Sequence, residues 1–224
     1  MGLFSKNDSI EYKSLDDYSS FLNSLLLNDQ FISRKEILEQ YNDRLKMIEE
    51  LELMDDKGVL INWCKKNKTD YKTLKTLIHS YKNTEKVIKK HNDDYVNKHL
   101  VSDKEYLDSV LLKDDPNIVL DEEQRRVVLS DEDYTLVIAG AGAGKTTTIE
   151  AKVKYLVDKE NVNPERILIV SFTRKATDEL RERFARLDIP VNISTFHSIG
   201  NTIIKDNDGE RHGVDIMLVF KLEK

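Results

Sequence analysis

One segment limits the folds open to this chain more than any other, and it reads Ala139-Gly140-Ala141-Gly142-Ala143-Gly144-Lys145-Thr146. It follows an apolar run that predicts a strand over Thr135–Ala139, and it leads into a pattern that predicts a helix over Thr146–Asp158. A strand, a glycine-rich turn and a helix in this order are the context of a phosphate-binding loop. Glycines, which lack a Cβ, let the backbone wrap around phosphate oxygens and direct N–H groups at them.

Two side chains at the start of the helix give this loop its expected chemistry. Lys145 brings a positive charge to the outer phosphates of a nucleotide, and the Thr146 hydroxyl is expected to ligate Mg²⁺. Ala139 departs from the general pattern, which has Gly at that first position, and the alternative is a turn that only joins a strand to a helix. The candidate nucleotide site comprises Ala139, Gly140, Ala141, Gly142, Ala143, Gly144, Lys145, Thr146 and Thr147, with Lys145 and Thr146 as the catalytic pair.

The pattern of the chain changes near Pro116. After it, short β-rich runs alternate with helical patterns, which predicts parallel strands joined by crossover helices. Beyond the loop helix we expect strands at Ile167–Ser171 and Val191–Ser194, and helices at Lys175–Leu187 and Phe196–Lys205. The fold class is therefore α/β, with at least three parallel strands that carry the motifs at their carboxyl ends. Residues 1–115 form a predicted helical domain, and residues 116–224 form the predicted α/β portion.

Residues 1–115 show helical spacing. Ser33 and Glu36 form a capping-box pattern at a helix start, and Asp55–Gly58 marks a stop. Apolar residues recur on single helix faces at Leu38, Tyr41, Leu45 and Ile48, and again at Leu74, Leu77, Ile78 and Tyr81, with a third helix over Thr84–Leu100. These stripes favour helices that pack on each other over a coiled coil, because no heptad run is sustained. Nine lysines between Lys65 and Lys90 indicate either a solvated basic helix or an accessory DNA contact.

Composition excludes several classes of protein. The net charge of −6 argues against a polybasic nucleic-acid arm, although it leaves room for a local basic groove. Cys64 is the only cysteine, which excludes an internal disulfide and a multi-cysteine zinc site. No apolar run approaches the ~20 residues needed to cross a bilayer, and the N-terminus has no apolar signal core. We expect a soluble, cytoplasmic protein with no membrane contact.

Segments on both sides of the loop narrow the function. Residues 120–128 precede it, whereas residues 167–176 and 193–198 follow it. In order and spacing these segments resemble the Q motif, motif I, motif Ia and motif Ib of the UvrD/Rep-like superfamily 1 DNA helicases. A helical extension before the Q motif is most similar in layout to helicase IV and its relatives. The resemblance covers about residues 118–206 and implies that residues 116–224 are the N-terminal portion of a RecA-like ATP-binding domain.

The resemblance also implies roles for individual residues. Gln124 would bind the adenine edge and favour ATP, because its amide offers both a donor and an acceptor. Phe172, Arg174 and His197 fall where members of the family contact single-stranded DNA; Arg174 replaces a common Asn, and Phe172 can stack on a base. The alternative for Phe172 and for Phe196 is that each is simply a core residue, and it stays open here. The implied cofactors are ATP and Mg²⁺.

Two hypotheses follow from this comparison. The chain is the N-terminal portion of an ATP-dependent DNA helicase or translocase, or it is a truncated stand-alone module that binds ATP or a protein without turnover. Residues 1–115 are the candidate docking region for a protein partner. The family hydrolyses ATP with an Asp-Glu pair, a Gln and arginines that have no counterpart after His197, so we expect residues 1–224 alone to lack turnover.

Overall fold

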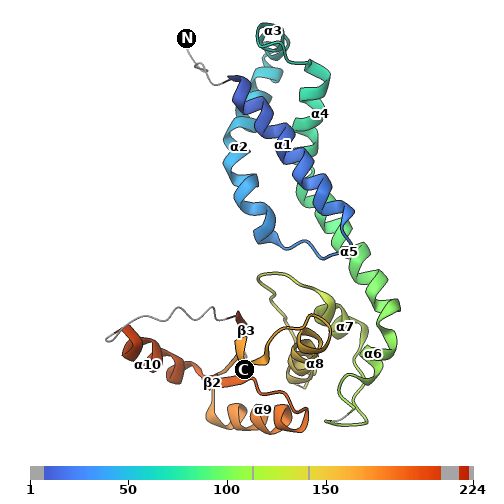
Figure 1. The fold of residues 1–224 in the computed structure, drawn as a ribbon, viewed down its shortest axis with the longest axis vertical. Helices are drawn as coiled ribbons and strands as arrows, with labels where there is room; N and C mark the ends of the chain where they lie inside the picture. Colours follow the sequence, from blue (N-terminus) through green and yellow to red (C-terminus); the bar gives the residue numbers. More distant parts are fainter. Residues whose placement is uncertain (1–7, 113, 141, 208–216, 222–224) are drawn as a thin grey trace. The chain divides into compact units, whose positions relative to one another are not determined.

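The computed structural model describes residues 8–112, 114–140, 142–207 and 217–221 (Figure 1). The chain forms two compact units. The first comprises Met1–Lys98 together with Ser130–Thr135, and the second comprises His99–Leu129 together with Leu136–Lys224. The predicted domains, residues 1–115 and 116–224, remain a prediction.

The first unit is helical. Its elements are α1 (Asp8–Leu27), α2 (Arg34–Asp56), α3 (Leu60–Lys66), α4 (Tyr71–Lys82) and most of α5 (Thr84–Ser102). The predicted capped start of α2 is confirmed, because the Ser33 N–H donates to Glu36 Oε2 at 2.8 Å. The predicted stop is also confirmed: α2 ends at Asp56, and Gly58 adopts a φ of 67° that favours glycine.

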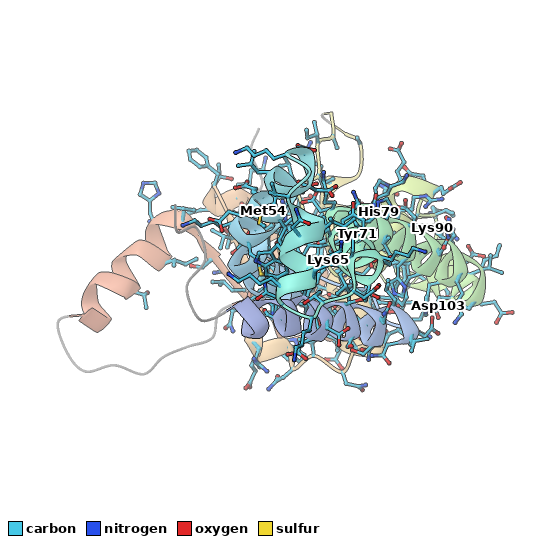
Figure 2. All side chains as sticks on the ribbon, turned by 90° about the horizontal axis from the view of Figure 1, so that it is seen from above. Met54, Lys65, Tyr71, His79, Lys90 and Asp103 are labelled. Atoms are coloured by element: carbon cyan, nitrogen blue, oxygen red, sulfur yellow. The ribbon has the colours of Figure 1, made fainter. Side chains whose placement is uncertain are left out.

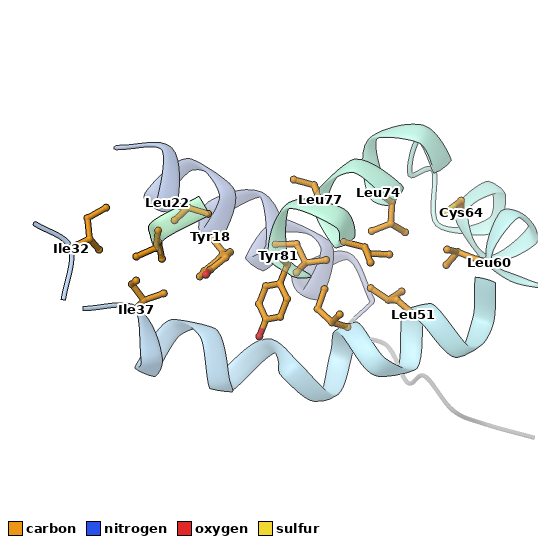
Figure 3. Close-up of a cluster of buried hydrophobic side chains, with 14 residues drawn as sticks. Tyr18, Leu22, Ile32, Ile37, Leu51, Leu60, Cys64, Leu74, Leu77 and Tyr81 are labelled. Carbon is orange, nitrogen blue, oxygen red and sulfur yellow. The ribbon is translucent and has the colours of Figure 1, made fainter. Parts of the chain in front are cut away.

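A core of apolar side chains holds the first unit together (Figure 3). The predicted face of α4 is confirmed, since its four apolar residues Leu74, Leu77, Ile78 and Tyr81 are all buried. The Tyr41 ring stacks on the Tyr81 ring with centroids 4.5 Å apart, and the Tyr18 hydroxyl donates to Thr84 Oγ1 at 3.0 Å. The buried hydroxyl of Tyr18 therefore has the partner that burial requires.

The predicted apolar face of α2 is wrong in part. Leu45 is exposed, whereas Ile37 and Leu51 are buried with the correctly predicted Ile48. The reason is that Arg44 occupies a core-facing position: its Nε donates to the Ser14 carbonyl at 2.9 Å, and its guanidinium lies over the Tyr18 ring. A charged residue on the buried face shifted the apparent apolar stripe by one residue.

The second unit contains helices and a small sheet. Its elements are α6 (Lys104–Ser109), α7 (Glu122–Leu129), α8 (Lys145–Asp158), a 3₁₀ helix (Pro164–Arg166), β1 (Ile167–Ser171), α9 (Arg174–Arg186), β2 (Asn192–Thr195), α10 (Phe196–Asn207) and β3 (Met217–Lys221). The three strands are parallel in the order β2-β1-β3, with Ser171 opposite Thr195. The two predicted strands and three predicted helices from residue 146 to residue 205 are confirmed within one or two residues, and an α/β fold class follows.

The predicted strand at Thr135–Ala139 is wrong. These residues form no strand, and the Leu136 and Ile138 side chains are 84% and 89% exposed. A strand needs a neighbouring strand for its backbone hydrogen bonds, and β2 and β3 occupy both edges of β1. The third strand that we expected is instead β3, which we did not predict from the sequence although four of its five residues are apolar. No helix in the described part of the chain is long and apolar enough to span a bilayer.

Candidate nucleotide-binding site

The glycine-rich loop ends where α8 begins, as the sequence predicts. Gly142 and Gly144 have φ values of 76° and 74°, a backbone conformation that side chains with a Cβ rarely adopt. Gly144 is the N-cap of α8, so the N–H groups of Lys145, Thr146 and Thr147 lie in the first turn and lack partners within the helix. These groups form a site suited to an anion. Ala141 lies outside the described residues.

Two polar groups of the loop form hydrogen bonds with the loop itself. Lys145 Nζ donates to the carbonyls of Ala139 at 2.9 Å and Gly140 at 2.8 Å. The Ala143 N–H also donates to the Gly140 carbonyl, at 3.3 Å. The lysine charge and one N–H group that a phosphate would bind are therefore turned toward oxygen atoms of the loop itself.

Gln124 lies beside this loop although it is 20 positions before Gly144 in the sequence. Its Nε2 donates to the Ala143 carbonyl at 3.5 Å, and a Cβ built on Gly144 would lie 2.4 Å from the same nitrogen. Gln124 Oε1 accepts the Asp121 N–H at 2.9 Å, and Asp121 Oδ1 accepts the Gln124 N–H at 2.8 Å. This reciprocal capping of α7 was missed, although the Asp-x-x-Gln spacing carries the signal.

The predicted DNA-contacting residues follow the ends of β1 and β2. Phe172 comes directly after β1 and Phe196 directly after β2, and the strands pair Ser171 with Thr195. The two phenylalanines are therefore at equivalent positions of adjacent strands. They are 69% and 59% exposed, so the core role for Phe196 is wrong. Arg174 and His197, in the first turns of α9 and α10, are exposed as well.

A buried cluster of charges connects the loop helix α8 with α9, and no pattern in the sequence predicts it. Glu150 of α8 is fully buried, and both of its carboxylate oxygens lie 3.3 Å from Arg183 Nη1 of α9. Asp114 contributes a second buried carboxylate, which pairs with Arg186 and lies 3.8 Å from Arg183. Burial raises the pKa of Glu150 to about 7, against the opposing effect of the Arg183 charge. One charged side chain of α9, Arg183, therefore pairs with a buried carboxylate rather than with solvent.

The basic stretch of the first unit is partly neutralised. Lys75 and Lys82 pair with Asp55 and Glu52 of α2, while Lys89 and Lys90 pair with aspartates one turn further along α5. The side chains of Lys65, His79 and Lys90 are exposed or half-exposed along α3, α4 and α5 (Figure 2). An accessory DNA contact here remains a prediction.

The residues present fit a Mg-nucleotide. Lys145 and the first N–H groups of α8 supply positive charge and donors, and Thr146, which is half-buried, supplies a hydroxyl oxygen of the kind that Mg²⁺ prefers. Within the described ranges, no group of three or more His, Cys, Asp or Glu side chains could hold a metal ion by itself. A metal here would be held together with the phosphates.

Comparison with known proteins gives one consistent match. Residues 120–218 match the family model of the UvrD/REP helicase N-terminal domain. The matched range holds the glycine-rich loop, Gln124 and all four residues that follow β1 and β2.

Similar proteins come from several bacteria. A probable DNA helicase II homolog of Mycoplasma capricolum is 41% identical over 103 residues, covering 43% of this chain and 14% of the relative. A probable DNA helicase of Mycoplasma pneumoniae is 40% identical over 100 residues, covering 42% and 18%. The ATP-dependent DNA helicase PcrA of Staphylococcus aureus is 36% identical over 97 residues, covering 42% and 13%. The matched segment thus spans less than a fifth of each of these relatives.

Proposed function

We propose that this chain is the N-terminal portion of an ATP-dependent DNA helicase or translocase, because residues 120–218 match the family model of the UvrD/REP helicase N-terminal domain. The single observation that carries the proposal is the loop at residues 139–147, which opens α8 with two left-handed glycines and a lysine. The similarity of this chain to proteins named as DNA helicases supports DNA as the substrate. We assign residues 116–224 to a RecA-like ATP-binding domain.

ATP and Mg²⁺ are the proposed ligands of the loop. Lys145 and the first N–H groups of α8 would bind the β- and γ-phosphates, and Thr146 would ligate Mg²⁺. Gln124, already beside the loop, would turn its amide to the adenine edge. Bound Mg²⁺ would neutralise the charge of the phosphates, and the residues of this chain would position them.

Single-stranded DNA is the proposed substrate of the surface that follows β1 and β2. The exposed Phe172 and Phe196 rings provide π faces for bases of any sequence. Arg174 and His197 lie beside them and would contact phosphates. Binding of this kind depends on salt and not on sequence.

Titration with Mg-ATP tests the proposal. Lys145→Ala should weaken binding at least ~10-fold, which corresponds to about 1.4 kcal/mol. Lys66→Ala removes an exposed lysine of the first unit and serves as the matched control, so it should bind like the wild type. Equal affinities of wild type and Lys145→Ala would remove Lys145 from the site. The absence of nucleotide and DNA binding in the wild type would favour the alternative, a protein-interaction module.

A further inference from the structure

The segment that leads into the phosphate-binding loop is attached to the helical unit. The N–H of Arg34 donates to Glu132 Oε2 at 3.2 Å, and the N–H of Lys35 donates to Asp133 Oδ2 at 2.7 Å. Arg34 and Lys35 are the first two residues of α2, and each donor is 98 positions before its acceptor in the sequence. Residues 130–135 accordingly belong to the first compact unit, although they lie between α7 and the loop in the sequence.

The chemistry of this attachment is favourable. The first N–H groups of a helix have no partners within the helix, and the positive end of the helix dipole attracts carboxylates. The start of α2, which donates these hydrogen bonds, is itself held in place. Asn92, which is buried on α5, accepts the Ile32 N–H and donates to the Ile32 carbonyl, both at 2.9 Å. The start of α2 is therefore a rigid support for Glu132 and Asp133.

The attached segment continues directly into the phosphate-binding loop, whose carbonyls accept hydrogen bonds from Lys145. Only residues 134–138 separate Asp133 from Ala139, whose carbonyl accepts the Lys145 ammonium together with that of Gly140. Over these few residues the chain can extend by at most ~3.6 Å per residue. To turn Lys145 toward phosphates, its ammonium has to leave the carbonyls of Ala139 and Gly140, and a segment held at Asp133 would limit how these carbonyls move as it does so.

We propose that Glu132 and Asp133 form a latch on α2 that favours the self-bonded conformation of the phosphate-binding loop, so that release of the latch promotes Mg-ATP binding. The inference rests on the proposed nucleotide-binding function and names a regulation of that site. The coupling runs along the covalent chain from residue 133 to residue 140. By reciprocity, bound nucleotide would loosen the hold of α2 on Glu132 and Asp133.

A proline at the first position of α2 tests the latch with little disturbance. Arg34→Pro removes the N–H that binds Glu132, and proline is well tolerated at the first residue of a helix. Arg34→Ala is the matched control, because it removes the same side chain and keeps the N–H. Within the described residues that side chain forms an ion pair with Glu85, at 3.8 Å and with both side chains exposed, so its loss should matter little. The double variant Glu132→Gln, Asp133→Asn weakens the latch from the other side.

Two measurements on the full 224-residue chain test whether the latch controls Mg-ATP binding. Arg34→Pro and the double variant should bind Mg-ATP about fivefold more tightly or better than Arg34→Ala, within the usual range of allosteric coupling. Without nucleotide, chymotrypsin should cleave after the exposed Tyr134 several-fold faster in the same variants, because cleavage requires a locally free segment. Equal affinities and equal cleavage rates in Arg34→Pro and Arg34→Ala would overturn the latch.

The same experiment separates failure of the latch from failure of the proposed function. If the wild type and every variant fail to bind Mg-ATP, the nucleotide-binding function is wrong, and the cleavage rates alone decide whether the latch exists. If all proteins bind equally well and are cleaved equally fast, nucleotide binding stands and the latch is wrong. Circular dichroism of each variant confirms that α2 still forms.

Discussion

Replacement of the buried Glu150 by glutamine should stabilise the second unit at neutral and alkaline pH. Burial raises the pKa of Glu150 from 4.5 to about 7, and the nearby Arg183 charge only partly offsets this effect. Between these two values the folded chain holds a proton that the unfolded chain has released. The free energy of unfolding of the wild type therefore falls as the pH rises through this window.

The expected difference in the free energy of unfolding follows from the two pKa values. The interval from 4.5 to about 7, at about 1.4 kcal/mol for each pH unit, amounts to about 3 kcal/mol. Glutamine has nearly the shape of the protonated acid and cannot ionise. The Glu150→Gln variant and the wild type should thus be equally stable near pH 4.5, and the variant should be more stable by up to about 3 kcal/mol at pH 8.

Urea unfolding at several pH values between 5 and 8, followed by far-UV circular dichroism, measures this difference. Trp63 is the only tryptophan and lies in the first unit, so its fluorescence reports a transition that the change should not move. Glu179→Gln is the matched control: Glu179 also pairs with Arg183, at 3.1 Å, but is exposed, and its replacement should produce no pH-dependent difference. If Glu150→Gln were less stable than the wild type at pH 8, attraction to Arg183 would outweigh burial and the reasoning would be wrong.

Three further predictions test the site and the core. Phe172→Ala should weaken single-stranded DNA binding by about 1–3 kcal/mol in fluorescence anisotropy at low salt, while the equally exposed Val119→Ala should not; equal losses would refute the stacking role. Gly144→Ala places a Cβ at a φ of 74° and should lower the free energy of unfolding by about 1–2 kcal/mol, whereas Gly140→Ala, which has open space and no such φ, should be neutral. Leu74→Ala empties a fully buried position and should cost about 2–5 kcal/mol in urea unfolding monitored by tryptophan fluorescence, so a smaller loss would mean that the core refills the space.

Local patterns predicted those elements whose determinants are close in sequence. The start of α2 depends on Ser33 and Glu36, and β1 matches the apolar run Ile167–Ser171 residue for residue. The start of α8 depends on the glycines before Lys145, so the nucleotide loop could be located from the sequence as well. In each case a short stretch of chain contains the physical cause.

Elements that depend on distant partners were predicted less well. Residues 135–139 have the composition of a strand, but strand formation depends on which segments pair with β1. In the folded chain β2 pairs with one edge of β1 and β3 with the other. Arg44 hid the true core face of α2 because only the folded unit shows its contacts with Ser14 and Tyr18. The Glu150 cluster was missed for the same reason, since its charges come from separate segments of the chain.

The exposed run from Tyr134 to Ala139 also affects how this chain behaves in concentrated solution. It contains six uncharged residues, Tyr-Thr-Leu-Val-Ile-Ala, with high β propensity and no proline, which is the composition of segments that nucleate aggregation through intermolecular β pairing. Three acidic residues, Asp131, Glu132 and Asp133, stand directly before it, where charged gatekeepers commonly flank such segments. The same carboxylates that contact α2 therefore also supply the repulsion that keeps two copies of this segment apart.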